Sequence, residues 1–244
     1  HDLRVLQLTR REVEGTGTEA DPERKPILFV MAAVHAREYT TAELVLRFAE
    51  ELVAGYGSDA DATWILDEHE VHLLLQANPD GRVRAEGGIL WRKNTDNDFC
   101  TGTPSRGVDL NRNFSEQWGC CNGSSPVPCN ETYRGPAPAS EPETAAVEAY
   151  LESIFPDQWH PEPGPEATGV FLDIHSYGEL VLWPWGTRSD LWLPSAEGLE
   201  MLGRRLAAPN GYDPRQAVEF YPTDGSTVDF DYGRLGVAAF TIAL

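Results

Sequence analysis

The sequence predicts an α/β protein with a mixed, mainly parallel central β-sheet and helices on both faces of the sheet. Two observations predict this class. Short, continuous apolar runs, typical of strands buried on both faces, alternate with segments of helical spacing. The length of 244 residues suits one α/β domain, which can bury a large core without metal or disulfide staples.

In the first part of the chain, a strand is expected at residues 26–34, where apolar residues follow one another without a break. A helix is expected at 40–53, beginning with a Thr-x-x-Glu capping box at Thr40 and continuing with apolar residues at helical spacing. The apolar run at 71–77 predicts a second strand. The Asn-Pro-Asp-Gly segment that follows it, at 78–81, predicts a turn.

Residues 95–139 are rich in loop-forming residues, and a helix is expected to follow them at 140–154, capped by Ser-x-x-Glu. A proline-rich connector occupies residues 156–165. Beyond it the pattern predicts strands at 169–174, 180–183 and 237–244, and helices at 199–207 and 228–235.

The charge balance excludes several kinds of partner. The chain carries 19 basic and 39 acidic residues, a net charge of −20. Nucleic acids are poor partners, because phosphate binding needs a basic face, and an anionic membrane surface is disfavoured for the same reason. No apolar run is long enough for a transmembrane helix. The chain opens with His-Asp-Leu-Arg, and we expect that any targeting segment has been removed or never existed.

Four cysteines lie within one loop-rich segment, at Cys100, Cys120, Cys121 and Cys129. Their spacing does not match a zinc finger, since it has no C-x2-C pair and no neighbouring pair of histidines. A disulfide-tied surface loop in a secreted protein is the simpler interpretation. Four cysteines allow three pairings, among which the spacing does not choose.

Two histidines are expected at the carboxyl ends of strands, where ligands of parallel sheets bind. His35 follows the first strand, His175 ends the third, and Glu38 lies three residues after His35. Two imidazoles and a carboxylate are a suitable set for catalytic Zn²⁺, which takes three protein ligands and leaves one position open. A chance H-x-x-E and a buried structural histidine are the simpler alternative.

Five collinear stretches carry a resemblance to a known family. They are Val-His-Ala-Arg-Glu at 34–38, Asn-Pro-Asp-Gly at 78–81, Trp-Arg-Lys at 91–93, Gly-Val-Asp-Leu-Asn-Arg-Asn-Phe at 107–114 and Phe-Leu-Asp-Ile-His-Ser-Tyr at 171–177. In order and spacing they resemble the zinc carboxypeptidases of the carboxypeptidase A family. Cys-Cys-Asn-Gly-Ser-Ser at 120–125 and Glu-Thr-Tyr-Arg-Gly at 131–135 are most similar to the bacterial, secreted, carboxypeptidase T-like branch.

The resemblance implies one zinc ion per chain, held by His35, Glu38 and His175. It implies that Arg92 stabilises the oxyanion formed during hydrolysis, since a fixed guanidinium suits developing negative charge. It pairs Cys100 with Cys129, and leaves Cys120 and Cys121 either joined to each other or reduced.

Substrate contacts also follow from the resemblance. Asn111 and Arg112 match the pair that grips the C-terminal carboxylate of a peptide, which an Arg fork can bind bidentately. Arg37 matches a secondary contact, and Tyr221 matches a mobile tyrosine that closes over the bound end. Val228 stands at the position that reads the last side chain, which favours a peptide with an apolar or aromatic C-terminal residue. Asp224 or Asp229 is the alternative, and would widen acceptance to Lys or Arg.

The chain also departs from the family. The family's general base is a glutamate late in the last strand, and here Ala243 stands in its place in Phe-Thr-Ile-Ala-Leu at 240–244. Glu131 and Glu179 are alternative bases that no motif places. The family domain is expected to extend beyond both ends of this chain, so residues 1–244 correspond to one catalytic domain trimmed at both ends.

The sequence therefore predicts a secreted, monomeric metallocarboxypeptidase domain that acts on peptide C-termini. It predicts little or no activity for this form, because Ala243 stands in place of the general-base glutamate. A first alternative is a zinc-containing module that binds peptide C-termini without cutting them. A second alternative, a deacylase of small acylated amino acids, fits less well with the complete set formed by Arg92, Asn111 and Arg112.

Overall fold

A seven-stranded mixed sheet forms the centre of the computed structural model, which describes residues 1–10, 25–159 and 167–244. The strand order is β1-β3-β2-β4-β7-β5-β6. The inner strands β3, β2, β4 and β7 run parallel, whereas β1 and β5 pair antiparallel with β3 and β7. The strands are β1 (Val5–Leu8), β2 (Ile27–Ala32), β3 (Glu70–Leu74), β4 (Val170–His175), β5 (Leu180–Trp183), β6 (Asp213–Gln216) and β7 (Ala238–Ala243).

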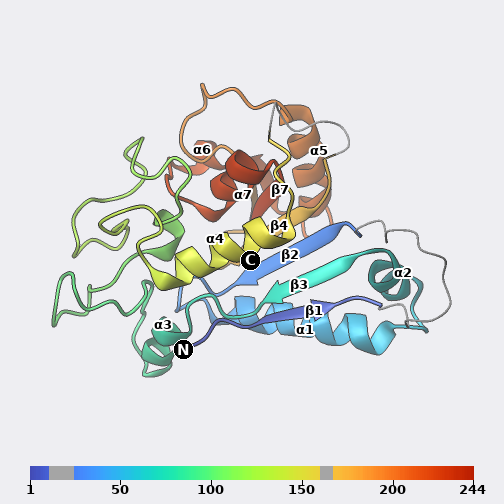
Figure 1. Ribbon diagram of the computed structural model, residues 1–244, viewed down its shortest axis with the longest axis horizontal. Helices are drawn as coiled ribbons and strands as arrows, with labels where there is room; N and C mark the ends of the chain where they lie inside the picture. Colours follow the sequence, from blue (N-terminus) through green and yellow to red (C-terminus); the bar gives the residue numbers. More distant parts are fainter. Residues whose placement is uncertain (11–24, 160–166) are drawn as a thin grey trace.

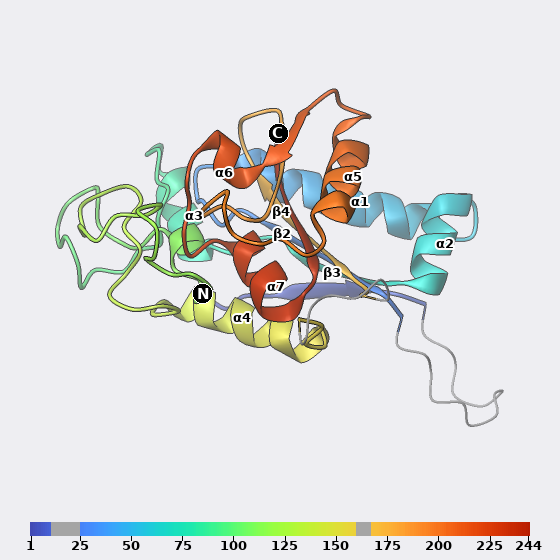
Figure 2. The ribbon, with the colours of Figure 1, turned by 90° about the horizontal axis from the view of Figure 1, so that it is seen from above.

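Helices cover both faces of this sheet, as the views in Figures 1 and 2 show. The helices α4 and α7 lie on one face, and α1 and α2 lie on the other. The elements are α1 (Tyr39–Gly55), α2 (Ala60–Glu68), α3 (Pro79–Glu86), the 3₁₀ turn η1 (Leu110–Arg112), α4 (Pro142–Ile154), α5 (Ala196–Ala207), α6 (Ala217–Phe220) and α7 (Thr227–Leu235). The predicted fold class is confirmed.

Side-chain alternation along the inner strands divides the core into two layers. Phe29 and Phe171 stack with ring centroids 5.7 Å apart and pack beneath α4. Val30, one position beyond Phe29, and Ile174, three positions beyond Phe171, join the cluster under α1 and α2. Strands with apolar residues on both faces have to be covered on both sides, which explains the continuous apolar runs in the sequence.

Several local predictions are wrong. Residues 78–81 do not form a simple turn: Asn78 accepts the N–H of Gly81 through its side chain and caps α3, whose first residue is Pro79. A proline at the first helical position and an Asn cap are as compatible with a helix start as with a turn. Neither predicted capping box forms, because α1 follows Glu38 and α4 follows Glu141 without a side-chain cap.

The sheet places the carboxyl ends of β2, β4 and β7 side by side. In the parallel register Ala32 lies opposite Ile174, and His175 lies opposite Ala243. Ligands of such sheets bind beyond this edge. The predicted connector at 156–165 lies partly outside the described residues. No helix in the described ranges is both long and apolar enough to cross a lipid bilayer.

Candidate metal centre and active site

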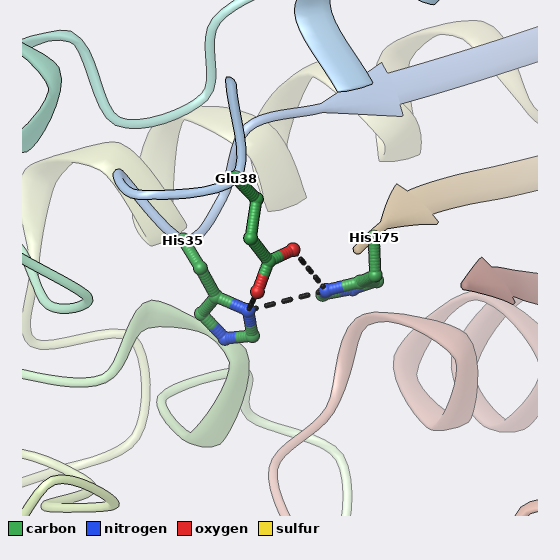
Figure 3. A group of neighbouring side chains, drawn as sticks. All are labelled: His35, Glu38 and His175. Carbon is green, nitrogen blue, oxygen red and sulfur yellow. Dashed lines mark hydrogen bonds and ion pairs between the residues drawn. The ribbon is translucent and has the colours of Figure 1, made fainter. Parts of the chain in front are cut away.

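Three buried side chains meet beyond the carboxyl ends of β2 and β4, as Figure 3 shows. His35 comes from the turn after β2, Glu38 from the residue before α1, and His175 from the last position of β4. His35 Nδ1 lies 2.8 Å from Glu38 Oε1, and His175 Nδ1 lies 3.1 Å from His35 Nδ1 and 3.2 Å from Glu38 Oε2. Four potential ligand atoms therefore face one point.

The arrangement fits a zinc ion. Zn²⁺ with ligands at its usual distances has about 3.3 Å between neighbouring ligand atoms in a tetrahedron, close to the separations just given. One cation can bind Nδ1 of His35, Nδ1 of His175 and the Glu38 carboxylate at the same time. The three residues leave the fourth position of a catalytic zinc site open. They are the zinc ligands expected from the sequence.

A second carboxylate lies behind each histidine. His35 Nε2 is 3.2 Å from Asp109 Oδ1, and His175 Nε2 is 2.8 Å from Asp173 Oδ2. Both aspartates are fully buried. A carboxylate that accepts the Nε2 proton leaves Nδ1 free to bind metal, so these contacts orient both rings toward the same point.

The charges of the centre stabilise one another. Burial raises the pKa of Glu38, but His35 and His175 outweigh burial and hold it well below its usual range. Burial lowers the pKa of His175, but Asp173 and Glu38 outweigh it and raise the pKa to about 10. The backbone N–H of Ser176 also donates to Glu38 Oε2 over 3.0 Å.

Arg92 lies beside the centre and is fixed by Asp109. Its Nε and Nη2 donate to Asp109 Oδ2 over 3.1 and 2.8 Å. Burial raises the pKa of Asp109, but Arg92 outweighs burial and, with His35, holds that pKa well below its usual range. One buried carboxylate therefore aligns a metal ligand and a guanidinium at the same time.

A pocket of about 580 Å³ opens over the metal centre. It is lined by the three metal ligands and by seven further side chains that the sequence singled out: Arg37, Arg92, Asn111, Arg112, Tyr221, Val228 and Ala243. The lining residues come from segments far apart in the sequence, which the sheet edge brings together. Among the described residues, Glu38 is the one carboxylate in this lining.

The two residues expected to grip a peptide carboxylate lie in η1. Arg112 is buried, and its Nε and Nη1 donate to the backbone oxygens of Gly123 and Asn111. The side-chain oxygen of Asn111 accepts the N–H of Thr227 over 3.0 Å, and its Nδ2 lies 3.2 Å from His175 Nε2. The backbone thus holds the guanidinium in place at the pocket wall.

Comparison with known proteins identifies the family. The family model described as zinc carboxypeptidase matches residues 1–244. The chain belongs to the zinc carboxypeptidase family. Mouse carboxypeptidase A1 is 30% identical over 233 residues, which cover 90% of this chain and 51% of that protein. Human carboxypeptidase A5 is 35% identical over 225 residues, which cover 86% of this chain and 46% of that protein.

The fold agrees with that assignment. The crystal structure of carboxypeptidase A from Helicoverpa armigera superposes with a TM-score of 0.80 and 24% identity over 99% of this chain and 56% of that one. The curated relatives are animal carboxypeptidases A and B, so they support this wider group and not the expected bacterial branch. The chain spans about half the length of the curated relatives it matches.

Three further residues that the sequence analysis expected at the substrate site line the pocket. Arg37 is partly exposed and lies 3.5 Å from Glu131. Tyr221 is 46% exposed, and its ring centroid lies 4.6 Å from that of Phe220. Val228 is buried in the first turn of α7 and contributes an apolar surface to the pocket.

Ala243 ends β7 directly beside His175. Neighbouring residues of paired strands direct their side chains to the same face, so position 243 points toward the metal centre. A methyl group there accepts no proton. Neither alternative base, Glu131 or Glu179, lies in the described pocket lining, and both are exposed.

Two disulfides tie the loop-rich segment. Cys100 pairs with Cys129, as the resemblance implied, and Cys120 pairs with its neighbour Cys121. The segment at the second disulfide contacts the loop before α7: the N–H groups of Cys121 and Gly123 donate to Asp224 Oδ2. The loop thereby supports the carbonyl that holds Arg112.

Sequence reasoning did not identify Asp109 and Asp173 as site residues. A signal for Asp173 is present, because residues two apart in a strand share a face and Asp173 precedes His175 by two. Asp109 lies inside the 107–114 motif, two residues before Asn111, but nothing in the spacing reveals which histidine it contacts.

Proposed function

We propose that this chain is the catalytic unit of a zinc-dependent carboxypeptidase that binds the last residue of peptides, and that the form with Ala243 hydrolyses them very slowly. The observation that carries the proposal is the shared pocket, in which the ligand set His35, Glu38 and His175 faces the same space as Arg112. A carboxylate bound to Arg112 at a fixed distance from the metal limits the reaction to the terminal peptide bond.

Binding depends on three parts of the pocket. Arg112 offers a charge-assisted hydrogen bond to the terminal carboxylate, and Tyr221 covers the bound residue from the rim. Val228 lies with Leu180, Leu182 and Ala217 along the apolar part of the lining. This surface favours a peptide that ends in an apolar or aromatic residue.

Zinc in this site would polarise the scissile carbonyl and acidify a water molecule. Arg92, fixed by Asp109, is placed to stabilise the negative charge that develops on the carbonyl oxygen. A carboxylate at position 243 would accept the proton of the water and pass it to the leaving amine. Ala243 has no such group, so the chain lacks this proton transfer. General acid–base catalysis typically contributes about 10²–10⁴-fold.

Replacement of Ala243 tests the proposal. Ala243→Glu should raise the hydrolysis of a peptide with an apolar C-terminal residue by at least about a hundredfold, because it adds a carboxylate beside His175. Ala243→Gln is the matched control, since it has nearly the same size and no basic carboxylate. Equal activity of the two variants would show that packing, and not proton transfer, limits the protein.

The alternative function, a zinc-containing module that binds peptide C-termini without cutting them, is favoured by Ala243 alone. It predicts that Ala243→Glu stays inactive while peptide binding is intact. Four further predictions remain: a single catalytic domain, a monomeric state, membership of the bacterial branch, and secretion. The two disulfides support secretion.

A further inference from the structure

Asp173 lies at the point where the metal centre meets the substrate-binding wall. Its Oδ2 is 2.8 Å from His175 Nε2, accepts the hydroxyl of Thr227 over 2.6 Å and lies 3.5 Å from Asn111 Nδ2. These three neighbours come from β4, from the first turn of α7 and from η1. One carboxylate oxygen therefore contacts a zinc ligand and two elements that line the pocket.

The environment of Asp173 is unfavourable for a carboxylate that has no role beyond packing. Asp173 is fully buried, and its Oδ1 has no hydrogen-bond partner within the described residues. A buried polar atom without a hydrogen-bond partner destabilises the folded state. The single well-bonded oxygen is the one directed at His175 and Thr227, so the favourable contacts of this group lie on the side of the metal ligand.

We propose that Asp173 is a positioning residue for the zinc site. Its carboxylate accepts the Nε2 proton of His175, which fixes the ring orientation and leaves Nδ1 as the metal-binding atom. Thr227 in turn fixes the carboxylate. The hydroxyl of Thr227 belongs to the residue before Val228, so the same contact holds the pocket-lining turn of α7 against the metal ligand.

The two histidines then have equivalent support. Asp109 supports His35 and also holds Arg92, whereas Asp173 supports His175 and also holds Thr227. A hydrogen-bonded carboxylate behind a ligating histidine raises the basicity of the ring. Loss of such a partner typically weakens metal affinity about 10–100-fold.

A matched control exists in the same part of the core. Asp231 is also fully buried, and neither of its carboxylate oxygens finds a hydrogen-bond partner in the described structure. Asp231→Asn therefore removes an equally buried carboxyl group that does not hold a metal ligand. Thr227→Val is a second variant, because it keeps the shape of Thr227 and removes only the hydroxyl that fixes Asp173.

The test is zinc affinity of the full chain, measured by competition with a chromophoric chelator and without peptide. We expect Asp173→Asn to weaken zinc binding about 10–100-fold, Thr227→Val to weaken it less, and Asp231→Asn to leave it unchanged. Unchanged affinity in Asp173→Asn, or an equal loss in Asp231→Asn, would overturn the proposal. Because no peptide is used, the outcome is independent of whether the chain binds or cuts peptides.

A second measurement applies if Asp173→Asn does not fold. In the zinc-loaded wild-type protein, the nitrogen-bound proton at Nε2 of His175 should give a slowly exchanging NMR signal, shifted downfield by its bond to the carboxylate. The signal should move upfield in Thr227→Val and stay in place in Asp231→Asn. A rapidly exchanging Nε2 proton in the wild-type protein would contradict the proposed role of Asp173.

Discussion

Asp229 gives the chain a pH-dependent stability that one substitution should remove. This aspartate follows Val228 in the first turn of α7, is fully buried, and accepts the backbone N–H of Gly186 with Oδ1 at 2.9 Å and Oδ2 at 3.2 Å. Burial is the main cause of its altered ionisation and raises its pKa from 3.8 to about 7, although the Gly186 N–H opposes the change.

The sign of the effect follows from which state holds the proton. Between pH 4 and 7 the folded protein keeps the Asp229 proton that the unfolded chain releases. The contribution of Asp229 to stability is therefore complete below about pH 4, falls as the pH rises to about 7, and changes no further above that value. The total change amounts to about 4 kcal/mol, since each pH interval of one is worth about 1.4 kcal/mol.

The assay is urea unfolding of wild-type protein and Asp229→Asn between pH 4 and 8. The amide resembles the protonated carboxyl group and does not ionise. The two proteins should be similarly stable at pH 4, and Asp229→Asn should become the more stable one by up to about 4 kcal/mol near pH 8. A difference between the proteins that is independent of pH, or one that grows toward acid, would refute the reasoning.

Two other substitutions test the contacts of the site. Asp109→Asn should weaken zinc binding about 10–100-fold. It should also destabilise the fold by about 1.5–3 kcal/mol, because it takes the charged acceptor from the partly buried Arg92. Calorimetry of zinc binding and chemical unfolding measure the two effects, and wild-type values for both would contradict the geometry. Arg112→Ala should weaken binding of a peptide with a free C-terminal carboxylate about tenfold or more and leave binding of the matching C-terminal amide almost unchanged. An equal loss for both peptides would show that Arg112 does not read the carboxylate.

The strands that the sequence predicts correctly are those buried on both faces. β2 and β7 consist almost wholly of apolar residues, and β4 has apolar residues at four of its six positions, so these short runs indicate strands. The segments that were missed give weaker signals. Strand β1, Val-Leu-Gln-Leu, has no buried position, and β6, Asp-Pro-Arg-Gln, has no apolar pattern. Both lie at the edges of the sheet, where pairing to a neighbour and not side-chain burial defines the strand.

Helices α2 and α3 were not predicted, although each has an N-cap residue as a local signal. Apolar spacing alone does not reveal such a signal. Asp59 caps α2 by accepting the N–H of Ala62, and Asn78 caps α3 in the same way. In α3 the Pro-Asp-Gly segment favours a turn when read alone. The helix forms because the Asn78 side chain also donates to the backbone oxygens of Val34 and Lys93, contacts made by segments distant in the sequence.

The metal ligands could be predicted because both histidines lie at or shortly after the end of a buried strand, and Glu38 follows His35 by three residues. The supporting aspartates could not be assigned in the same way. The contact between Asp109 and His35 joins residues 74 positions apart, and it depends on how the long loop before η1 folds back onto the sheet edge. The pairing of Ala243 with His175 likewise follows from strand order, which local patterns do not determine.

The central claim is that zinc and a site for a free C-terminal carboxylate share one pocket. Calorimetric titration of the zinc-loaded protein with a short peptide ending in phenylalanine, as the free acid and as the amide, tests it most directly. The account predicts that the acid binds at least about tenfold more tightly than the amide and that removal of zinc weakens binding of the acid. Equal affinities for acid and amide, or binding of the acid that is indifferent to zinc, would contradict it.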